Sequence, residues 1–273
     1  MEEIANRHGL SALVPVLRRH ARPAAAFALG GTPGGRTRFG GAPLLPPRFE
    51  WPSYERRPLD FLLQVDLAEL RRFECAPTLP PTGLLTFFYD IEGQPWGYDP
   101  ADRDGSRVVL LDDGPLVETR PPRRSPLSPA GLRFWASSTL PAVGSRAYDR
   151  LELDAEVPDA YVDFALDFER QGYPTRSGLH RLLGHSANIQ GDMQLEAQLV
   201  SHGLYCGDDR GFLDPRAAAL DAGADDWTLL LQLDSEDAAG MMWGDTGMLY
   251  FWIRRADLAD RRFDRCWTLL QCP

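Results

Sequence analysis

The sequence predicts an α+β protein that is rich in β-strands, with mostly antiparallel sheets, an internal pseudo-twofold duplication and a few peripheral helices. Three observations support this fold class. Short apolar runs of strand length recur between clusters of Gly and Pro. Few segments place their apolar residues at helical spacing. Two strand-like runs recur in the same order in both halves of the chain. Because no clear linker separates the halves, we expect residues 1–273 to form a single domain.

The sequence holds few helical patterns. Residues 1–22 place their apolar side chains on one face and stop at Pro23, which predicts an N-terminal helix. Residues 159–170 follow a proline and end before Gly172, which predicts an amphipathic helix. A shorter helix is expected over 215–220.

The strand-like runs are short, apolar and rich in residues of high β-propensity. We expect strands at 24–29, 59–65, 84–89, 108–111, 132–136, 148–153, 227–233, 248–253 and 263–271. Between them lie segments that are rich in Gly, Pro, Asp and Arg, and these segments predict structured loops.

Two sequence matches indicate the duplication. Residues 62–66 (LLQVD) reappear as 230–234 (LLQLD), which lie 168 positions later. Residues 83–88 (GLLTFF) reappear as 247–252 (GMLYFW), which lie 164 positions later. Order and spacing are therefore nearly preserved. Two copies are too few for a solenoid, so we expect two pseudo-symmetric halves, at about 24–136 and 137–273.

The charge of the chain is unevenly distributed. The net charge is -10, from 39 acidic residues and 29 basic residues, and every basic residue is Arg. The absence of Lys excludes a lysine Schiff base and a P-loop lysine. Residues 1–72 carry +4, whereas residues 149–245 carry -14. Such an acidic stretch disfavours nucleic acid and favours a cationic partner, although it is also typical of a solvated, solubilising face.

The sequence also predicts a compartment. The four cysteines form no close pair, which is typical of reduced, buried thiols. The start of the chain is acidic where a secretory signal is basic and then apolar. No apolar run approaches the roughly 18 residues of a transmembrane helix. We expect a cytoplasmic protein that does not bind a membrane.

No catalytic or metal-binding motif is complete. Residues 184–188 (GHSAN) resemble a nucleophile elbow but end in Asn where that motif requires Gly. His180, His185, His202 and Cys206 have side chains that suit zinc, but their spacing matches no familiar zinc pattern. We therefore expect no catalytic residue of this kind, no metal and no cofactor.

A set of polar or amphipathic side chains stands out because each lies in strongly apolar surroundings. The set is Gln64, Asp66, Gln190, Gln232, Asp234, Trp243, Asp245 and Gln271. Unpaired burial of an amide costs about 1–3 kcal/mol, so these groups must be hydrogen-bonded. Two interpretations stay open: internal ties that fix loops, or a polar cleft between the pseudo-repeats that serves a small ligand or an enzyme reaction.

Several segments resemble the YwqG-like family. They are 39–46 (FGGAPLLP), 51–52 (WP), 58–67 (PLDFLLQVDL), 183–190, 192–193, 227–234, 243–253 and the closing Gln271. The family has Pro where this chain has Ser186. The family is a bacterial domain of unknown function, and no established catalytic residues are carried over. The resemblance implies a β-rich α+β fold with an internal duplication, and it implies a role that some members are regarded as having, as immunity proteins that neutralise a toxin encoded next door.

The resemblance and the charge lead to the same expected function. Nuclease toxins are typically cationic because they grip phosphates, and an acidic inhibitor gains on-rate and specificity. We expect a non-enzymatic, antitoxin-like immunity protein whose partner is a basic toxin, and not nucleic acid. The residues expected to bind this partner are Asp208, Asp209, Asp221, Asp225, Asp226, Glu236, Asp237, Tyr205 and Phe212. The alternatives are the Gln/Asp cleft and a scaffold without a single site.

Overall fold

The computed structural model describes residues 1–153, 157–174 and 177–273. Helix and strand each make up 27% of the chain, which confirms the predicted β-rich α+β class. The helices are α1 (Glu2–Arg7), α2 (Val14–His20), α3 (Leu67–Leu70), α4 (Arg146–Asp149), α5 (Pro158–Glu169), α6 (Met193–Val200), α7 (Ala217–Leu220) and α8 (Arg255–Ala259). The 3-10 turns include η2 (Ala76–Thr78), η4 (Asp221–Asp226), η5 (Asp237–Ala239) and η6 (Phe263–Arg265).

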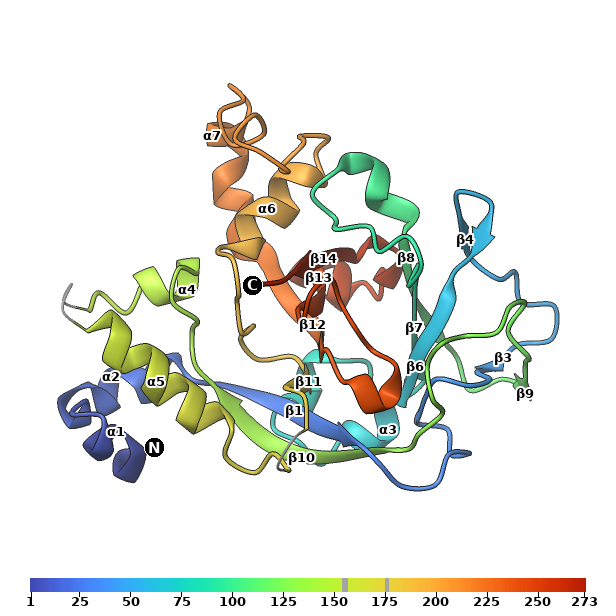
Figure 1. Ribbon diagram of the computed structural model, residues 1–273, viewed down its shortest axis with the longest axis horizontal. Helices are drawn as coiled ribbons and strands as arrows, with labels where there is room; N and C mark the ends of the chain where they lie inside the picture. Colours follow the sequence, from blue (N-terminus) through green and yellow to red (C-terminus); the bar gives the residue numbers. More distant parts are fainter. Residues whose placement is uncertain (154–156, 175–176) are drawn as a thin grey trace.

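The strands are β1 (Arg22–Leu29), β2 (Arg38–Phe39), β3 (Leu44–Leu45), β4 (Ser53–Tyr54), β5 (Arg57–Pro58), β6 (Asp60–Asp66), β7 (Leu84–Tyr89), β8 (Ser106–Leu111), β9 (Val117–Glu118), β10 (Leu132–Thr139), β11 (His180–Leu182), β12 (Trp227–Asp234), β13 (Met248–Arg254) and β14 (Trp267–Gln271). They form a six-stranded sheet in the order β10-β1-β11-β12-β13-β14 and a four-stranded sheet in the order β2-β6-β7-β8 (Figure 1). All neighbouring strands in both sheets are antiparallel, as predicted.

The main core lies between the two sheets. Phe87 of β7 meets Phe251 of β13 edge to face, with ring centroids 5.2 Å apart. Tyr89 and Trp243 make a similar contact at 5.8 Å. The far face of β12, β13 and β14 is covered by α6, which packs on their apolar side chains, and α7 packs against α6 (Figure 1). Burial of both faces explains why β12, β13 and β14 have continuous apolar sequences.

The two strand triplets β6-β7-β8 and β12-β13-β14 have equivalent registers. Each contains a register irregularity, after Phe61 in β6 and after Leu229 in β12, and these residues lie 168 positions apart. Gly83 and Gly247 precede β7 and β13, where a Cβ would approach a carbonyl oxygen of the adjacent strand to 2.9 and 2.2 Å. These equivalences are what the predicted duplication requires, and the duplication itself stays a prediction.

The N-terminal helix expected over 1–22 is instead two helices, α1 and α2. Gly9 has φ +71°, a left-handed conformation that ends the first helix. Both helices pack against α5, and Ile4, Leu17 and Phe164 are buried in a cluster of their own. Because of this break, both α1 and α2 contact α5.

The prediction of a strand at 148–153 is wrong, because this segment begins within α4. The Ser145 hydroxyl accepts a hydrogen bond from the Tyr148 amide at 3.2 Å and caps this helix. The strand expected from residue 263 begins only at Trp267, because η6 forms first.

The expected boundary between the halves crosses the sheets. Most of β1 and β10 falls within 24–136, yet β1 pairs with β11 and joins the sheet that holds β12, β13 and β14 of the other half. β11, α6 and α8 were not predicted from the sequence. β11 has only three residues and follows no periodic pattern, so its neighbours in the sheet define it.

Candidate functional site

Residues 192–226 form a small helical unit, here called the acidic lobe. It comprises α6, the following loop, α7 and η4, and lies at the top of Figure 1. Its sequence holds eight Asp and Glu residues and two Arg residues. Asp192 caps α6 by accepting a hydrogen bond from the Gln194 amide at 3.2 Å. Trp227 anchors the lobe to the sheet by donating its indole N–H to Gln198 at 2.9 Å.

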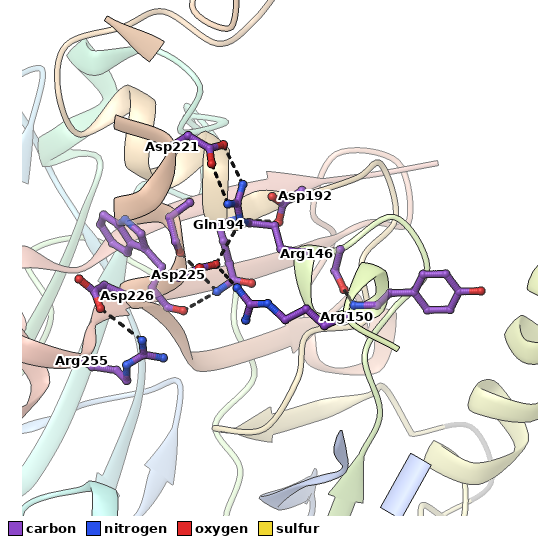
Figure 2. Close-up of polar contacts among 12 residues, drawn as sticks. Arg146, Arg150, Asp192, Gln194, Asp221, Asp225, Asp226 and Arg255 are labelled. Atoms are coloured by element: carbon purple, nitrogen blue, oxygen red, sulfur yellow. Dashed lines mark hydrogen bonds and ion pairs between the residues drawn. The ribbon is translucent and has the colours of Figure 1, made fainter. Parts of the chain in front are cut away.

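Three of the predicted partner-binding acids pair with arginines from outside the lobe. Both carboxylate oxygens of Asp221 accept from Arg146 of α4, each at 2.9 Å (Figure 2). Asp225 accepts from Arg146 at 3.2 Å and also from Arg150. The hydrogen bonds from Arg146 hold the pKa of Asp221 below its usual range. These pairs tie the lobe to α4, so Asp221 and Asp225 have a structural role that the sequence did not reveal.

Asp226 is the third of these acids. It pairs with Arg255 of α8 at 3.2 Å, and both side chains are more than half exposed (Figure 2). This ion pair contributes little to stability because water screens it.

The tip of the lobe is different. Asp209 is exposed, and Asp208 pairs with Arg210, two residues later in the same loop. Phe212 is 41% exposed, as expected, and Leu213 is 80% exposed. Leu213 was not predicted from the sequence, although its position between Phe212 and an acid was the available signal. The loop therefore presents exposed apolar side chains next to Asp209 and to two ion pairs, Asp208–Arg210 and Asp214–Arg216.

Tyr205 precedes this tip in the same loop. Its ring contacts Tyr98 edge to face, with centroids 5.6 Å apart, and the Arg210 guanidinium lies 4.7 Å from its centroid. Because these neighbours half-bury Tyr205, its ring supports the loop and offers little surface to a partner.

Glu236 and Asp237 lie outside the lobe. Glu236 accepts from Nε2 of the buried His180 at 2.9 Å, and this hydrogen bond lowers the pKa of Glu236. Nδ1 of His180 accepts from the Asp234 amide at 3.1 Å, so the imidazole links Glu236 to the end of β12. Glu236 is thus an internal tie and not the exposed acid that was expected. Asp237 is exposed on η5.

Glu196 of α6 has the most unusual environment among the acids of the lobe. Burial raises its pKa to about 7, with a smaller contribution from the nearby Asp192 carboxylate. The charge of Glu196 therefore changes near neutral pH.

The polar set does not line a cleft. Gln64 and Gln232 are fully buried, and their amides bond to the backbone of neighbouring loops. Oε1 of Gln271 accepts from the amides of Ile189 and Gln190, at 2.9 and 3.1 Å. These contacts agree with the first of the two interpretations, in which the polar side chains are internal ties that fix loops.

The remaining members of the set follow the same pattern or are exposed. Asp66 caps α3, and Asp234 accepts from the Leu179 amide at 2.8 Å. Trp243 is buried in the main core, whereas Gln190 and Asp245 are exposed at the surface. None of the eight lines the cavity described next.

A cavity of about 670 Å³ opens where β1, the end of β11 and α8 meet the loop between α3 and β7. Its charged lining residues are Arg22, Arg255, Arg261 and Glu74, and we call it the arginine cavity. Apolar walls come from prolines of the loop and from Leu79, Leu183 and Leu258.

The suspected nucleophile elbow is a polar loop. Ser186 donates to Asn188 and not to a histidine, and His185 bonds to the carbonyl oxygen of His20 at 2.8 Å. Within 1–153, 157–174 and 177–273, no three His, Cys, Asp or Glu side chains gather as metal ligands. Over the same residues, no helix is both long enough and apolar enough to span a bilayer.

Comparison with known proteins gives a family but no activity. No curated protein matches the sequence. Residues 37–272 match the family described as a domain of unknown function, DUF1963. This match covers both sheets from β2 onward, including every segment on which the resemblance was based. The chain therefore belongs to the DUF1963 family.

Proposed function

We propose that this chain is a non-enzymatic binding protein of the YwqG-like kind, an immunity protein that neutralises a cognate cationic toxin. The proposed partner is a secreted nuclease effector encoded by a neighbouring gene, and the proposed site of action is the cytoplasm. The acidic lobe is the proposed contact surface, and inhibition follows from covering the toxin's phosphate-binding face.

The tip of the acidic lobe is the observation that carries this proposal. Leu213 is the most exposed of the large apolar side chains, at 80%, and Phe212 lies beside it. The carboxylates of Asp208, Asp209 and Asp214 flank them in sequence. An apolar centre with a charged rim is typical of protein–protein interfaces.

Charge complementarity favours a basic partner. The stretch 149–245 carries -14, and including Arg7, Arg146 and Arg255, which pair into it, still leaves -11. Arginines from outside the stretch thus neutralise only a small part of its charge. Such an acidic stretch accelerates encounter with a cationic protein and disfavours nucleic acid as a competitor.

Isothermal titration against the catalytically inactivated product of the neighbouring gene tests the proposal. We expect one-to-one nanomolar binding that weakens as salt rises. In Asp209→Arg/Leu213→Asp we expect a loss of about 30-fold or more, the effect of removing an interface hot spot. Asp225 and Asp226 are left intact because they pair with arginines of the fold.

The matched control is Asp260→Arg/Val117→Asp, which makes the same change in net charge at exposed positions outside the lobe. It should bind within about threefold of the unmodified chain, as substitutions outside an interface do. No binding at micromolar concentrations, or equal binding by the lobe variant, would overturn the proposal.

A further inference from the structure

We propose that the arginine cavity binds a small organic anion, with an acidic headgroup held by arginines and an apolar body held by the cavity walls. This inference concerns a different surface from the acidic lobe and does not rest on the proposed function.

The size and walls of the cavity suit a small molecule. Its volume of about 670 Å³ lies within the range of small-molecule sites. Leu79, Leu183 and Leu258 are each less than 10% exposed and form apolar wall. Pro77, Pro80 and Pro81 add rigid apolar surface without side-chain donors.

The charge of the cavity is the second argument. Three guanidinium groups line it, against the single carboxylate of Glu74. In the described part of the chain, neither Arg22 nor Arg261 has an ion pair or a side-chain hydrogen bond, and Arg255 pairs only with Asp226. A cavity with two uncommitted guanidinium groups offers forked donors that fit a carboxylate or a phosphate.

The cations around Arg22 also repel one another. Burial lowers the pKa of Arg22, and the charges of Arg255 and Arg150 lower it further. His185, on the other side of Arg22, is held neutral, since burial and then the Arg22 charge lower its pKa to about 3. A bound anion would relieve this repulsion, whereas a cation would add to it.

The same observations limit the class of anion. The chain as a whole carries -10, which disfavours an extended polyanion such as nucleic acid. A bare inorganic ion would leave the apolar walls in contact with water. The expected ligand therefore combines one acidic group with an apolar body.

Four probes that each contain a chain of ten carbons, and inorganic phosphate, test this directly by isothermal titration. We expect decanoate or decyl phosphate to bind at least about tenfold more tightly than decanol, since each forms charge-assisted hydrogen bonds. Decyltrimethylammonium and inorganic phosphate should not bind at the same concentrations. The stronger of the two anions identifies the headgroup as carboxylate or phosphate.

Two variants locate the binding. Arg22→Gln/Arg261→Gln should weaken the anion by about tenfold or more, and Arg48→Gln/Arg133→Gln, with the same change in charge at exposed positions elsewhere, should not. Ala259→Trp, which fills the cavity from α8, should abolish binding, and Ala256→Trp on the same helix should leave it intact. The proposal is overturned if decanol matches the anions, or if either cavity variant binds as the unmodified chain does.

Discussion

Gln64 and Gln232 occupy the same place in the two sheets. Oε1 of Gln64 accepts from the Leu44 amide at 2.7 Å, and Oε1 of Gln232 accepts from the Ala187 amide at 2.9 Å. The two glutamines are 168 positions apart, as are the irregularities in β6 and β12. Each side chain ties the loop that follows a short strand, β2 or β11, to the long strand beside it.

Replacement of Gln232 by Leu should destabilise the fold. It removes the acceptor for the Ala187 amide and the donor to the Leu179 carbonyl, which lies at 2.8 Å. Each buried group left unpaired costs about 1–3 kcal/mol, so urea denaturation should show a loss of at least about 2 kcal/mol in the free energy of unfolding. Gln190→Leu, at an exposed side chain, should stay within about 0.5 kcal/mol. Equal stability of Gln232→Leu and the unmodified chain would contradict the role as a tie.

The forked pair between Arg146 and Asp221 should be measurable as a coupling energy. Both side chains are partly exposed, which limits the expected coupling to about 1 kcal/mol. A double-mutant cycle with Arg146→Gln and Asp221→Asn gives this value from denaturation midpoints. Arg146→Lys should recover less than half of it, because an ammonium group cannot donate to both carboxylate oxygens in the same way. Additive single effects would show that the pair does not hold the lobe.

Glu196 should make stability depend on pH. Its pKa is raised to about 7 in the folded chain from 4.5, so between these values the folded chain binds more protons than the unfolded chain does. The free energy of unfolding attributable to Glu196 therefore falls as pH rises through this window. Glu196→Gln should raise the melting temperature relative to the unmodified chain more at about pH 8 than at about pH 5. If the difference in melting temperature between Glu196→Gln and the unmodified chain did not change with pH, the raised pKa of Glu196 would be refuted.

Much of the fold could be predicted because its strands satisfy local rules. β7 matches its expected bounds, β12 and β13 differ by one residue at one end, and β6 is shifted by one residue. Their long apolar runs are buried on both faces, so the sequence signal is strong. β11 and the cap at Ser145 depend on tertiary neighbours or on one hydroxyl, and neither leaves a periodic pattern.

The candidate site was less predictable for a related reason. The sequence shows which residues are acidic, but it does not show that Arg146 reaches Asp221 from 75 positions away. Likewise, Arg22, Arg255 and Arg261 come together only because β1, β12 and α8 meet in the fold. Contacts between distant segments of the chain determine both the paired acids and the arginine cavity.

Hydrogen–deuterium exchange with and without the inactivated product of the neighbouring gene tests most directly whether the lobe is the contact surface. The loop of residues 207–216, which carries Phe212 and Leu213, should exchange more slowly when the partner is bound. Protection confined to other surfaces, or no change anywhere in a confirmed complex, would contradict the assignment of the acidic lobe as the binding surface.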